Sequence, residues 1–221
     1  MKILAWDGSA DPRSVALLEQ RAGEEPTLLV ETEAPGQRSA ALLQVVERIL
    51  REAGWRPADV TALAVGLGPG SYTGIRAALA LAQGWHLARG VPVHGAGSVE
   101  AIAARAWAAG WRGRTRVVVD AQRRELYVAG FALEDAGWRE VEPLRLEPVE
   151  TLQQRADRSD WLWTGPEVTR WFPEGRVLGP SAAWVARLAL RTQPRSPEAW
   201  EPIYLRPVQF VKTAPTREIT R

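Results

Sequence analysis

The stretch Thr61–Arg76, TALAVGLGPGSYTGIR, decides the fold of this chain. Its first residues are apolar and predict a strand, which runs into a glycine turn and then into a helix. Glycines admit positive φ values and a close approach of other groups. The turn can therefore hold a phosphate at the helix N-terminus, where unpaired N–H groups favour an anion, or it can let two backbone segments meet.

The helix after the turn, Thr73–Arg89, is apolar nearly all round. Its only clearly polar interior side chains are Arg76, Gln83 and His86, which are too few for a surface helix. We expect one side of it to lie on its own sheet and another side to meet a second layer, either of this protein or of another chain. The residues small enough to let a second helix come close are Ala77, Ala78, Ala80, Ala82 and Gly84.

The composition is that of a globular protein with one large or two small domains: 221 residues, 46% hydrophobic and 24% charged. The absence of cysteine excludes disulfides, thiolate metal sites and a cysteine nucleophile. No N-terminal signal pattern and no apolar run long enough to cross a membrane is present, so we expect a soluble cytoplasmic protein without a membrane partner. The net charge of +2 is close to neutral, and the one locally basic segment is the tail with Arg206, Lys212, Arg217 and Arg221, a candidate phosphate contact.

The first half of the chain predicts the order strand, strand, strand, helix, strand, helix. Three short successive strands indicate an antiparallel meander, and the first helix carries a broad apolar arc opposite its charged residues. The segments are Lys2–Trp6, Ser14–Glu19, Thr27–Thr32, Ser39–Ala53, a strand from Thr61, and Thr73–Arg89.

The same order returns in the second half, after a short strand at Val91–His94 and a helix from Ser98, which indicates a duplication. Asp7 and Asp120 each follow the first strand of their half. We therefore predict an α/β protein with duplicated ribonuclease-H-like sheets of the actin, Hsp70 and sugar-kinase (ASKHA) class, flanked by helices, with the second copy reduced. The expected domains are a first lobe (1–97), a smaller second lobe (98–193) and a C-terminal segment with the basic tail (194–221). The second-half segments are Thr115–Asp120, Glu125–Leu133, Arg139–Leu146, Val149–Arg155, Trp161–Thr164 and Ala182–Arg191.

A stand-alone kinase or ATPase of this class is the alternative function, and its candidate phosphate contacts are Asp7, Gly68, Gly70 and Ser71. However, the turn matches neither the P-loop nor the dinucleotide-binding glycine pattern, and the second half has no comparable turn. For Asp7–Gly8–Ser9 we favour a local Asx hydrogen bond that closes the strand.

Catalytic groups of other kinds are equally scarce. We interpret His86 and His94 as structural, and they do not form a metal-ligand pair. The only candidate platform for stacking nucleic-acid bases is Trp111–Arg114. The residues thus predict the shape of an enzyme without its active site, and no cofactor or metal.

Gly66–Arg76 resembles the TsaB (YeaZ) family of the bacterial machinery that installs threonylcarbamoyl on the adenosine following the tRNA anticodon (t6A). The resemblance extends along most of the chain. Its further matching stretches are Ile3–Ser9, Val91–Gly95, Gly97–Ala101, Val119–Tyr127 and Tyr204–Pro207.

The resemblance implies a non-catalytic subunit that pairs with its catalytic paralogue TsaD and with the ATPase TsaE, forms a homodimer when alone, and meets tRNA through the complex. It also implies that Ser39–Ala53 and Thr73–Arg89 build a helical bundle with the partner. Two departures from the family are Arg38–Ala40, where His-Ser-Glu is frequent, and Asp7–Ser9, where Asp-Thr-Ser is usual. The candidate contact residues are Leu42, Val46, Ile49, Gly74, Ile75, Ala77, Ala78, Ala80, Leu81 and Gly84.

Overall fold

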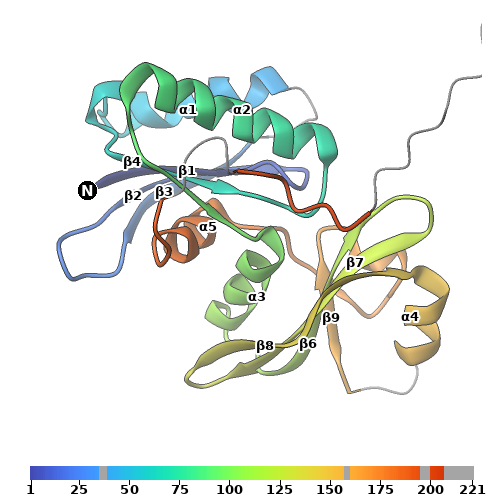
Figure 1. Ribbon diagram of the computed structural model, residues 1–221. Helices are drawn as coiled ribbons and strands as arrows, with labels where there is room; N and C mark the ends of the chain where they lie inside the picture. The colour runs from blue at the N-terminus through green and yellow to red at the C-terminus, as the bar shows by residue number, and fades with distance from the viewer. Residues whose placement is uncertain (35–38, 157–159, 195–199, 207–221) are drawn as a thin grey trace, which may run out of the picture.

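The computed structural model describes residues 1–34, 39–156, 160–194 and 200–206, which form two lobes, each built on a five-stranded sheet (Figure 1). The first sheet has the strand order β3-β2-β1-β4-β5. Its elements, with the helices that follow them in the chain, are β1 (Lys2–Asp7), β2 (Arg13–Glu19), β3 (Thr27–Ala34), α1 (Ser39–Glu52), β4 (Ala62–Gly66), α2 (Tyr72–Arg89), β5 (Val93–Ala96) and α3 (Ser98–Ala108).

The second sheet repeats the order of the first, because β8-β7-β6-β9-β10 corresponds to β3-β2-β1-β4-β5. In both sheets the first strand is antiparallel to the second and parallel to the fourth. This confirms the predicted duplicated ribonuclease-H-like fold, and the two-residue β10 shows that the second copy is reduced. The elements are β6 (Gly113–Asp120), β7 (Glu125–Glu134), β8 (Gly137–Pro148), α4 (Val149–Ala156), β9 (Leu162–Gly165), β10 (Arg176–Val177) and α5 (Ala182–Ala189).

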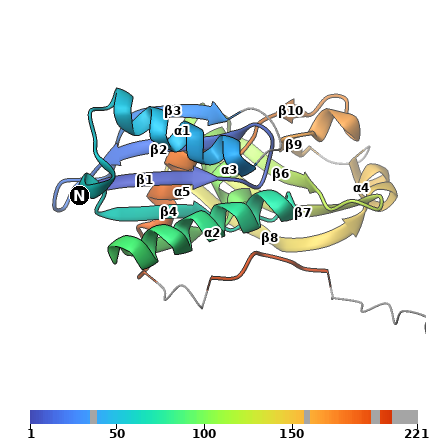
Figure 2. The ribbon, with the colours of Figure 1, turned by 90° about the horizontal axis from the view of Figure 1, so that it is seen from above.

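Helices cover the first sheet on both faces, and β1 supplies side chains to each. Because side chains alternate along a strand, Leu4 and Trp6 face α1 and α2, whereas Ile3 and Ala5 face α5. All four are fully buried. Figures 1 and 2 show α1 and α2 side by side over one face of this sheet.

Helix α5 lies on the first sheet, although it comes after the second sheet in the chain. Glu31 on β3 and Ser14 on β2 hold the N-terminus of α5. Ser181 Oγ donates to Glu31 Oε1 at 2.8 Å, and the amide of Ala182 donates to Ser14 Oγ at 3.0 Å. The second half of the sequence thus completes the first lobe. The domain boundaries 1–97, 98–193 and 194–221 stay a prediction.

After Trp200 the chain runs beside α2 and crosses to the second lobe; we call Trp200–Arg206 the C-terminal strap (Figures 1 and 2). Trp200 is buried in the core under α1 and α2, and the amide of Ile203 donates to the Leu67 carbonyl at 2.9 Å. Arg206 forms an ion pair with Glu125 at the start of β7. The predicted tail contacts at Lys212, Arg217 and Arg221, and the departure at Arg38, lie outside the described residues.

Candidate functional site

Helix α2 has one face inside the protein and one outside it. Ile75, Ala78 and Ala82 are fully buried against the sheet. On the opposite side Ala80 and Gly84 are exposed, and Leu87 is 83% exposed, the most exposed large apolar side chain among the described residues. The second lobe does not cover this outer face, so the possibility that this protein supplies the second layer itself is wrong for the part of the chain that the structure describes.

The apolar arc of α1 is used inside the chain. Of the predicted contact residues, six are buried in the core of the first lobe: Leu42, Val46, Ile49, Gly74, Ile75 and Ala78. Four are accessible: Ala77 and Leu81 are half-buried, and Ala80 and Gly84 are exposed. A partner that meets the described surface can reach the second group and not the first.

Sequence reasoning missed two side chains on this outer face. Leu43 on α1 is 45% exposed and Leu87 on α2 is 83% exposed, and neither was singled out. For Leu43 the available signal was its position off the apolar arc of α1, because an apolar residue there has no place in the chain's own core. For Leu87 the sequence held no such signal, since α2 is apolar nearly all round. The outer face of the two helices, which we call the helix-pair surface, therefore consists of Leu43, Ala77, Ala80, Leu81, Gly84 and Leu87.

The glycine turn brings two backbone segments together. The amide of Ser71 donates to the Ser9 carbonyl at 2.8 Å. A Cβ atom on Gly74 would lie 2.0 Å from the Gly8 carbonyl oxygen, and one on Gly70 would lie 2.2 Å from that of Ser9. Of the two roles open to this turn, the close approach of backbones is therefore realised in the structure.

Ser71 is the N-cap of α2, since its Oγ accepts from the amide of Gly74 at 3.2 Å. Of the four candidate phosphate contacts, Gly70 and Ser71 line the cavity between the lobes, whereas Asp7 and Gly68 do not.

Asp7 is fully buried and is occupied by hydrogen bonds. Its Oδ1 accepts from the amide of Ser9 at 2.7 Å, which is the favoured Asx hydrogen bond, and from Ser9 Oγ at 2.6 Å. Its Oδ2 accepts from Ser98 Oγ at 2.6 Å and so joins the end of β1 to the start of α3. Burial raises the pKa of Asp7, and the hydrogen bonds from Ser9 and Ser98 oppose that rise. A Cβ on Gly66 would lie 1.9 Å from Asp7 Oδ2, which explains the glycine at the end of β4.

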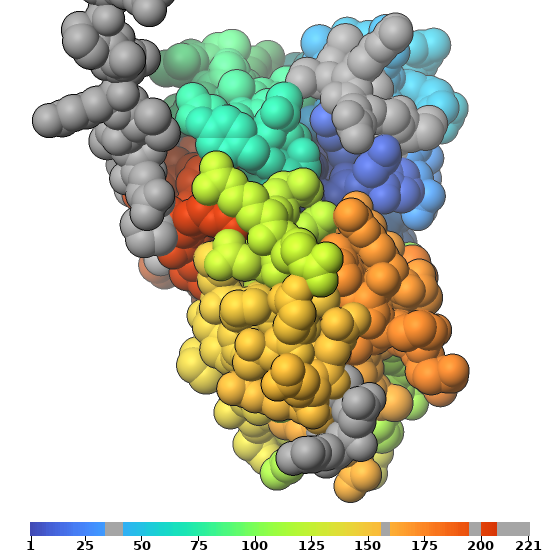
Figure 3. All heavy atoms as spheres, turned by 90° about the vertical axis from the view of Figure 1, so that its right-hand side faces the viewer, coloured from blue at the N-terminus to red at the C-terminus, as the bar shows by residue number. Residues whose placement is uncertain are grey.

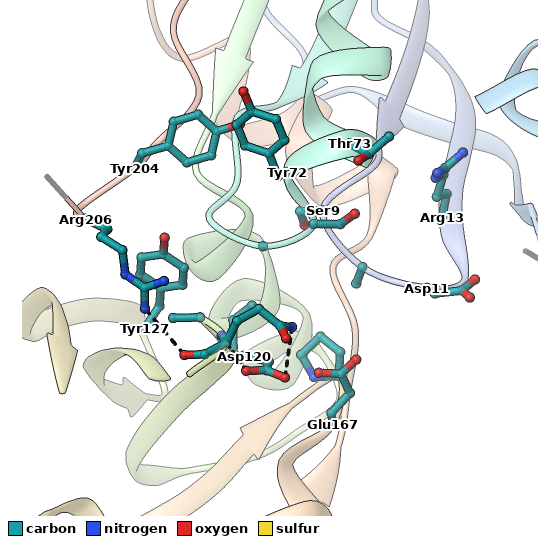
Figure 4. Close-up of a pocket in the computed structure, with 17 residues that line it drawn as sticks. Ser9, Asp11, Arg13, Tyr72, Thr73, Asp120, Tyr127, Glu167, Tyr204 and Arg206 are labelled. Atoms are coloured by element: carbon teal, nitrogen blue, oxygen red, sulfur yellow. Dashed lines mark hydrogen bonds between the residues drawn. The ribbon is translucent and has the colours of Figure 1, made fainter. Parts of the chain in front are cut away.

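The cavity between the lobes has a volume of about 560 Å³ (Figure 4). Figure 3 shows this end of the molecule, where the start of α2 (teal) stands above the β6–β7 hairpin (yellow-green).

Asp120 repeats the local geometry of Asp7, because its Oδ1 accepts from the amide of Gln122 at 2.7 Å. Its Oδ2 forms an ion pair with Arg170 at 3.2 Å. Partial burial and the nearby Asp120 raise the pKa of Glu167. Both signs of charge thus line the cavity, and no set of three His, Asp or Glu side chains among the described residues is arranged to hold a metal ion.

Both histidines have structural partners, as predicted. His86 Nδ1 lies 2.8 Å from the Val91 carbonyl oxygen, and His94 Nδ1 lies 3.2 Å from that of Thr192. The stacking candidate Trp111–Arg114 does not present a bare ring, since Arg176 lies over Trp111 at 5.1 Å from the ring centre. In the described ranges no helix is both long and apolar enough to cross a membrane.

Known proteins resemble this chain over its whole length. Residues 32–141 match the protein family described as "TsaD: tRNA N6-adenosine threonylcarbamoyltransferase". The chain is 28% identical to the tRNA threonylcarbamoyladenosine biosynthesis protein TsaB of Escherichia coli (strain K12), over 99% of this chain and 100% of that protein. It is 30% identical to the TsaB protein of Haemophilus influenzae over 99% of each. The solved structure of YeaZ from Pseudomonas aeruginosa superimposes with a TM-score of 0.73 at 27% identity, over 92% of this chain and 99% of that one.

Proposed function

We propose that this chain, which belongs to the TsaB family of tRNA threonylcarbamoyladenosine biosynthesis proteins, is a non-catalytic subunit that activates the catalytic paralogue TsaD for threonylcarbamoyl transfer to tRNA. In this role the chain works in the cytoplasm, joins TsaD and the ATPase TsaE, and meets tRNA through the assembled complex. It carries no cofactor of its own. When TsaD is absent, two copies pair through the same helices.

The helix-pair surface is the observation that carries this proposal. Leu87 exposes a large apolar side chain on the same face of α2 as the small residues Ala80 and Gly84, and Leu43 exposes another on the neighbouring helix α1. Large exposed side chains next to small ones permit a facing helix to interlock closely, which is a feature of interface cores. Leucine exposed to this extent costs free energy in water, and burial against another chain removes that cost.

The state of Asp7 supports the absence of catalysis by this chain alone. A phosphoryl-transferring site of this fold class needs a carboxylate free to position a metal or a nucleophile. Asp7 lies inside the protein, and both of its oxygens accept hydrogen bonds from serine hydroxyls. Its geometry is that of a structural link between β1 and α3.

A matched pair of substitutions tests the proposal. Ala80→Arg places a charge at the centre of the helix-pair surface, whereas Ala136→Arg places the same charge on the exposed turn between β7 and β8. Purified TsaD is titrated with each variant by calorimetry, and t6A formation is measured with the complete set of proteins. We expect Ala80→Arg to abolish binding and modification and Ala136→Arg to leave both unchanged. Binding of Ala80→Arg at wild-type affinity would refute the proposal.

A further inference from the structure

We propose that the surface that contacts the partner continues from α2 onto the C-terminal strap, with Tyr72, Tyr204 and Leu205 as its apolar centre. This inference rests on the proposed function. The protein that we expect to occupy this surface is TsaD, the partner proposed above for the helix-pair surface. We call these three side chains the strap patch.

All three members of the strap patch are exposed, and its two tyrosines are in contact. Tyr72 is 59% exposed, Tyr204 is 38% exposed and Leu205 is 39% exposed. The rings of Tyr72 and Tyr204 stack with their centres 5.3 Å apart and their planes at 27° (Figure 4). A stacked and exposed pair of tyrosines is the kind of aromatic surface that is enriched in interfaces between proteins. Leu205 follows Tyr204 in the chain and adds an exposed apolar side chain to the strap.

The strap patch is continuous with the outer face of α2. The strap runs along the side of α2 that faces away from α1 (Figure 2). Tyr72 and Arg76 are one turn apart on that side, and Arg76 and Ala80 are one turn apart again, so the exposed row passes from the strap to the centre of the helix-pair surface. A partner seated on Ala80 therefore meets Tyr72 at the edge of its footprint.

Arg76 gives the partner a charge preference at this edge. Its Nη1 donates to the Tyr72 hydroxyl at 2.9 Å, and its guanidinium lies 5.2 Å from the centre of the Tyr72 ring. Within the described part of the chain Arg76 forms no ion pair. The fitting partner segment is therefore apolar and places a carboxylate opposite Arg76.

The strap is anchored at both ends, so it presents its side chains in a fixed position. Trp200 is only 5% exposed and meets His86 edge to face, with 6.3 Å between the ring centres. At the other end Arg206 pairs with Glu125 and donates to the Gln122 carbonyl at 3.4 Å. A surface that is already ordered loses little conformational entropy when a partner binds.

Two substitutions remove parts of the strap patch and one serves as a matched control. Tyr72→Ala removes the ring at the start of α2, and Leu205→Ser removes an apolar side chain without breaking the tyrosine stack. Val177→Ser removes an apolar side chain that is 59% exposed on β10, at the outer edge of the second sheet. Affinity for purified TsaD is measured by calorimetry with the full chain, and circular dichroism melting confirms that each variant is folded.

The expected result is a loss of affinity of about tenfold for each strap variant, from the apolar area that the partner no longer covers, and no loss for Val177→Ser. Wild-type affinity for Leu205→Ser overturns the inference, whatever Tyr72→Ala does. A loss confined to self-association, measured by sedimentation, also overturns it, because the occupant is then a second copy. Ala80→Arg separates the two proposals. If Ala80→Arg abolishes binding to TsaD while the strap variants bind normally, only the inference about the strap patch is refuted. If Ala80→Arg binds TsaD normally, the proposed function and the inference about the strap patch are both refuted.

Discussion

Replacing either of two glycines in α2 with alanine should change the free energy of unfolding, but in opposite directions. Gly74 and Gly84 both lie inside α2, and alanine is the better helix former by about 1 kcal/mol at such positions. A Cβ on Gly84 would meet no atom within 4 Å. A Cβ on Gly74 would lie 2.0 Å from the Gly8 carbonyl oxygen, which is backbone and cannot rotate away.

The structure sets the size of both effects. Gly84→Ala should stabilise the folded chain by about 1 kcal/mol, since nothing opposes the gain in helix propensity. Gly74→Ala has the same gain of about 1 kcal/mol, but the helix has to move more than 1 Å away from Gly8. Overpacking costs about 1–3 kcal/mol, and because this clash is with backbone we expect the upper end, about 3 kcal/mol, and hence a net loss of roughly 2 kcal/mol. For a chain of this size these changes correspond to a Tm about 2–4 °C higher for Gly84→Ala and about 4–8 °C lower for Gly74→Ala.

Thermal melting and urea unfolding of the isolated chain measure both changes. The wild type and the two variants are compared at pH 7, and the urea slopes show whether unfolding stays two-state. Binding to TsaD supplies a second readout, because the added methyl group of Gly84→Ala stands on the helix-pair surface and should weaken a closely packed partner.

A Tm for Gly74→Ala equal to or above that of Gly84→Ala would refute the close backbone contact between Gly8 and Gly74. The glycine turn would then need another explanation, and the phosphate-holding role would again be open.

Three further substitutions probe other links in the fold. Burial raises the pKa of Asp7, so the ionised carboxylate is disfavoured in the folded state. The stability of the fold therefore decreases as the pH rises from 3.8, the ordinary pKa of this group, through the raised pKa of the folded state. Asp7→Asn should remove this pH dependence, measured as the free energy of unfolding in urea over this range. Hydrogen bonding to Arg116 lowers the pKa of Glu142, so the pair stabilises the fold above the ordinary value of 4.5 and that contribution is lost as the pH falls through the lowered pKa; an unchanged acid limb in Glu142→Gln would contradict this. Glu31→Ala leaves Ser181 without its carboxylate partner and should cost about 1–2 kcal/mol, read as a Tm lower by about 2–8 °C.

Periodicity and turn chemistry were sufficient to predict the main elements of the fold. The strands end at residues that close turns, such as Asp7 and Asp120, and α2 ends at Gly90 in the left-handed conformation. Because these signals are local, they appear in the sequence as clearly as in the structure. The two-residue β10 carries too short a pattern to be seen.

The faces of the helices could not be predicted in the same way. The apolar arc of α1 with Leu42, Val46 and Ile49 looks the same whether it packs on the chain's own sheet or on a partner, and here it packs on the sheet. The placement of α5 on the first sheet depends on long-range contacts such as the one between Glu31 and Ser181, which leave no periodic trace. Leu87 is recognisable as a surface residue only once the buried side of α2 is known.

The return of α5 to the first sheet has a consequence for synthesis. Strands β1, β2 and β4 leave the ribosome early, yet the helix that shields Ile3, Ala5 and Leu18 is translated last among the described helices. Until residue 189 has emerged, the apolar side chains on one face of the nascent sheet are exposed to solvent and prone to aggregation. In chains that terminate before α5 this apolar face stays exposed permanently, and we expect such chains to be bound by chaperones and degraded by proteases.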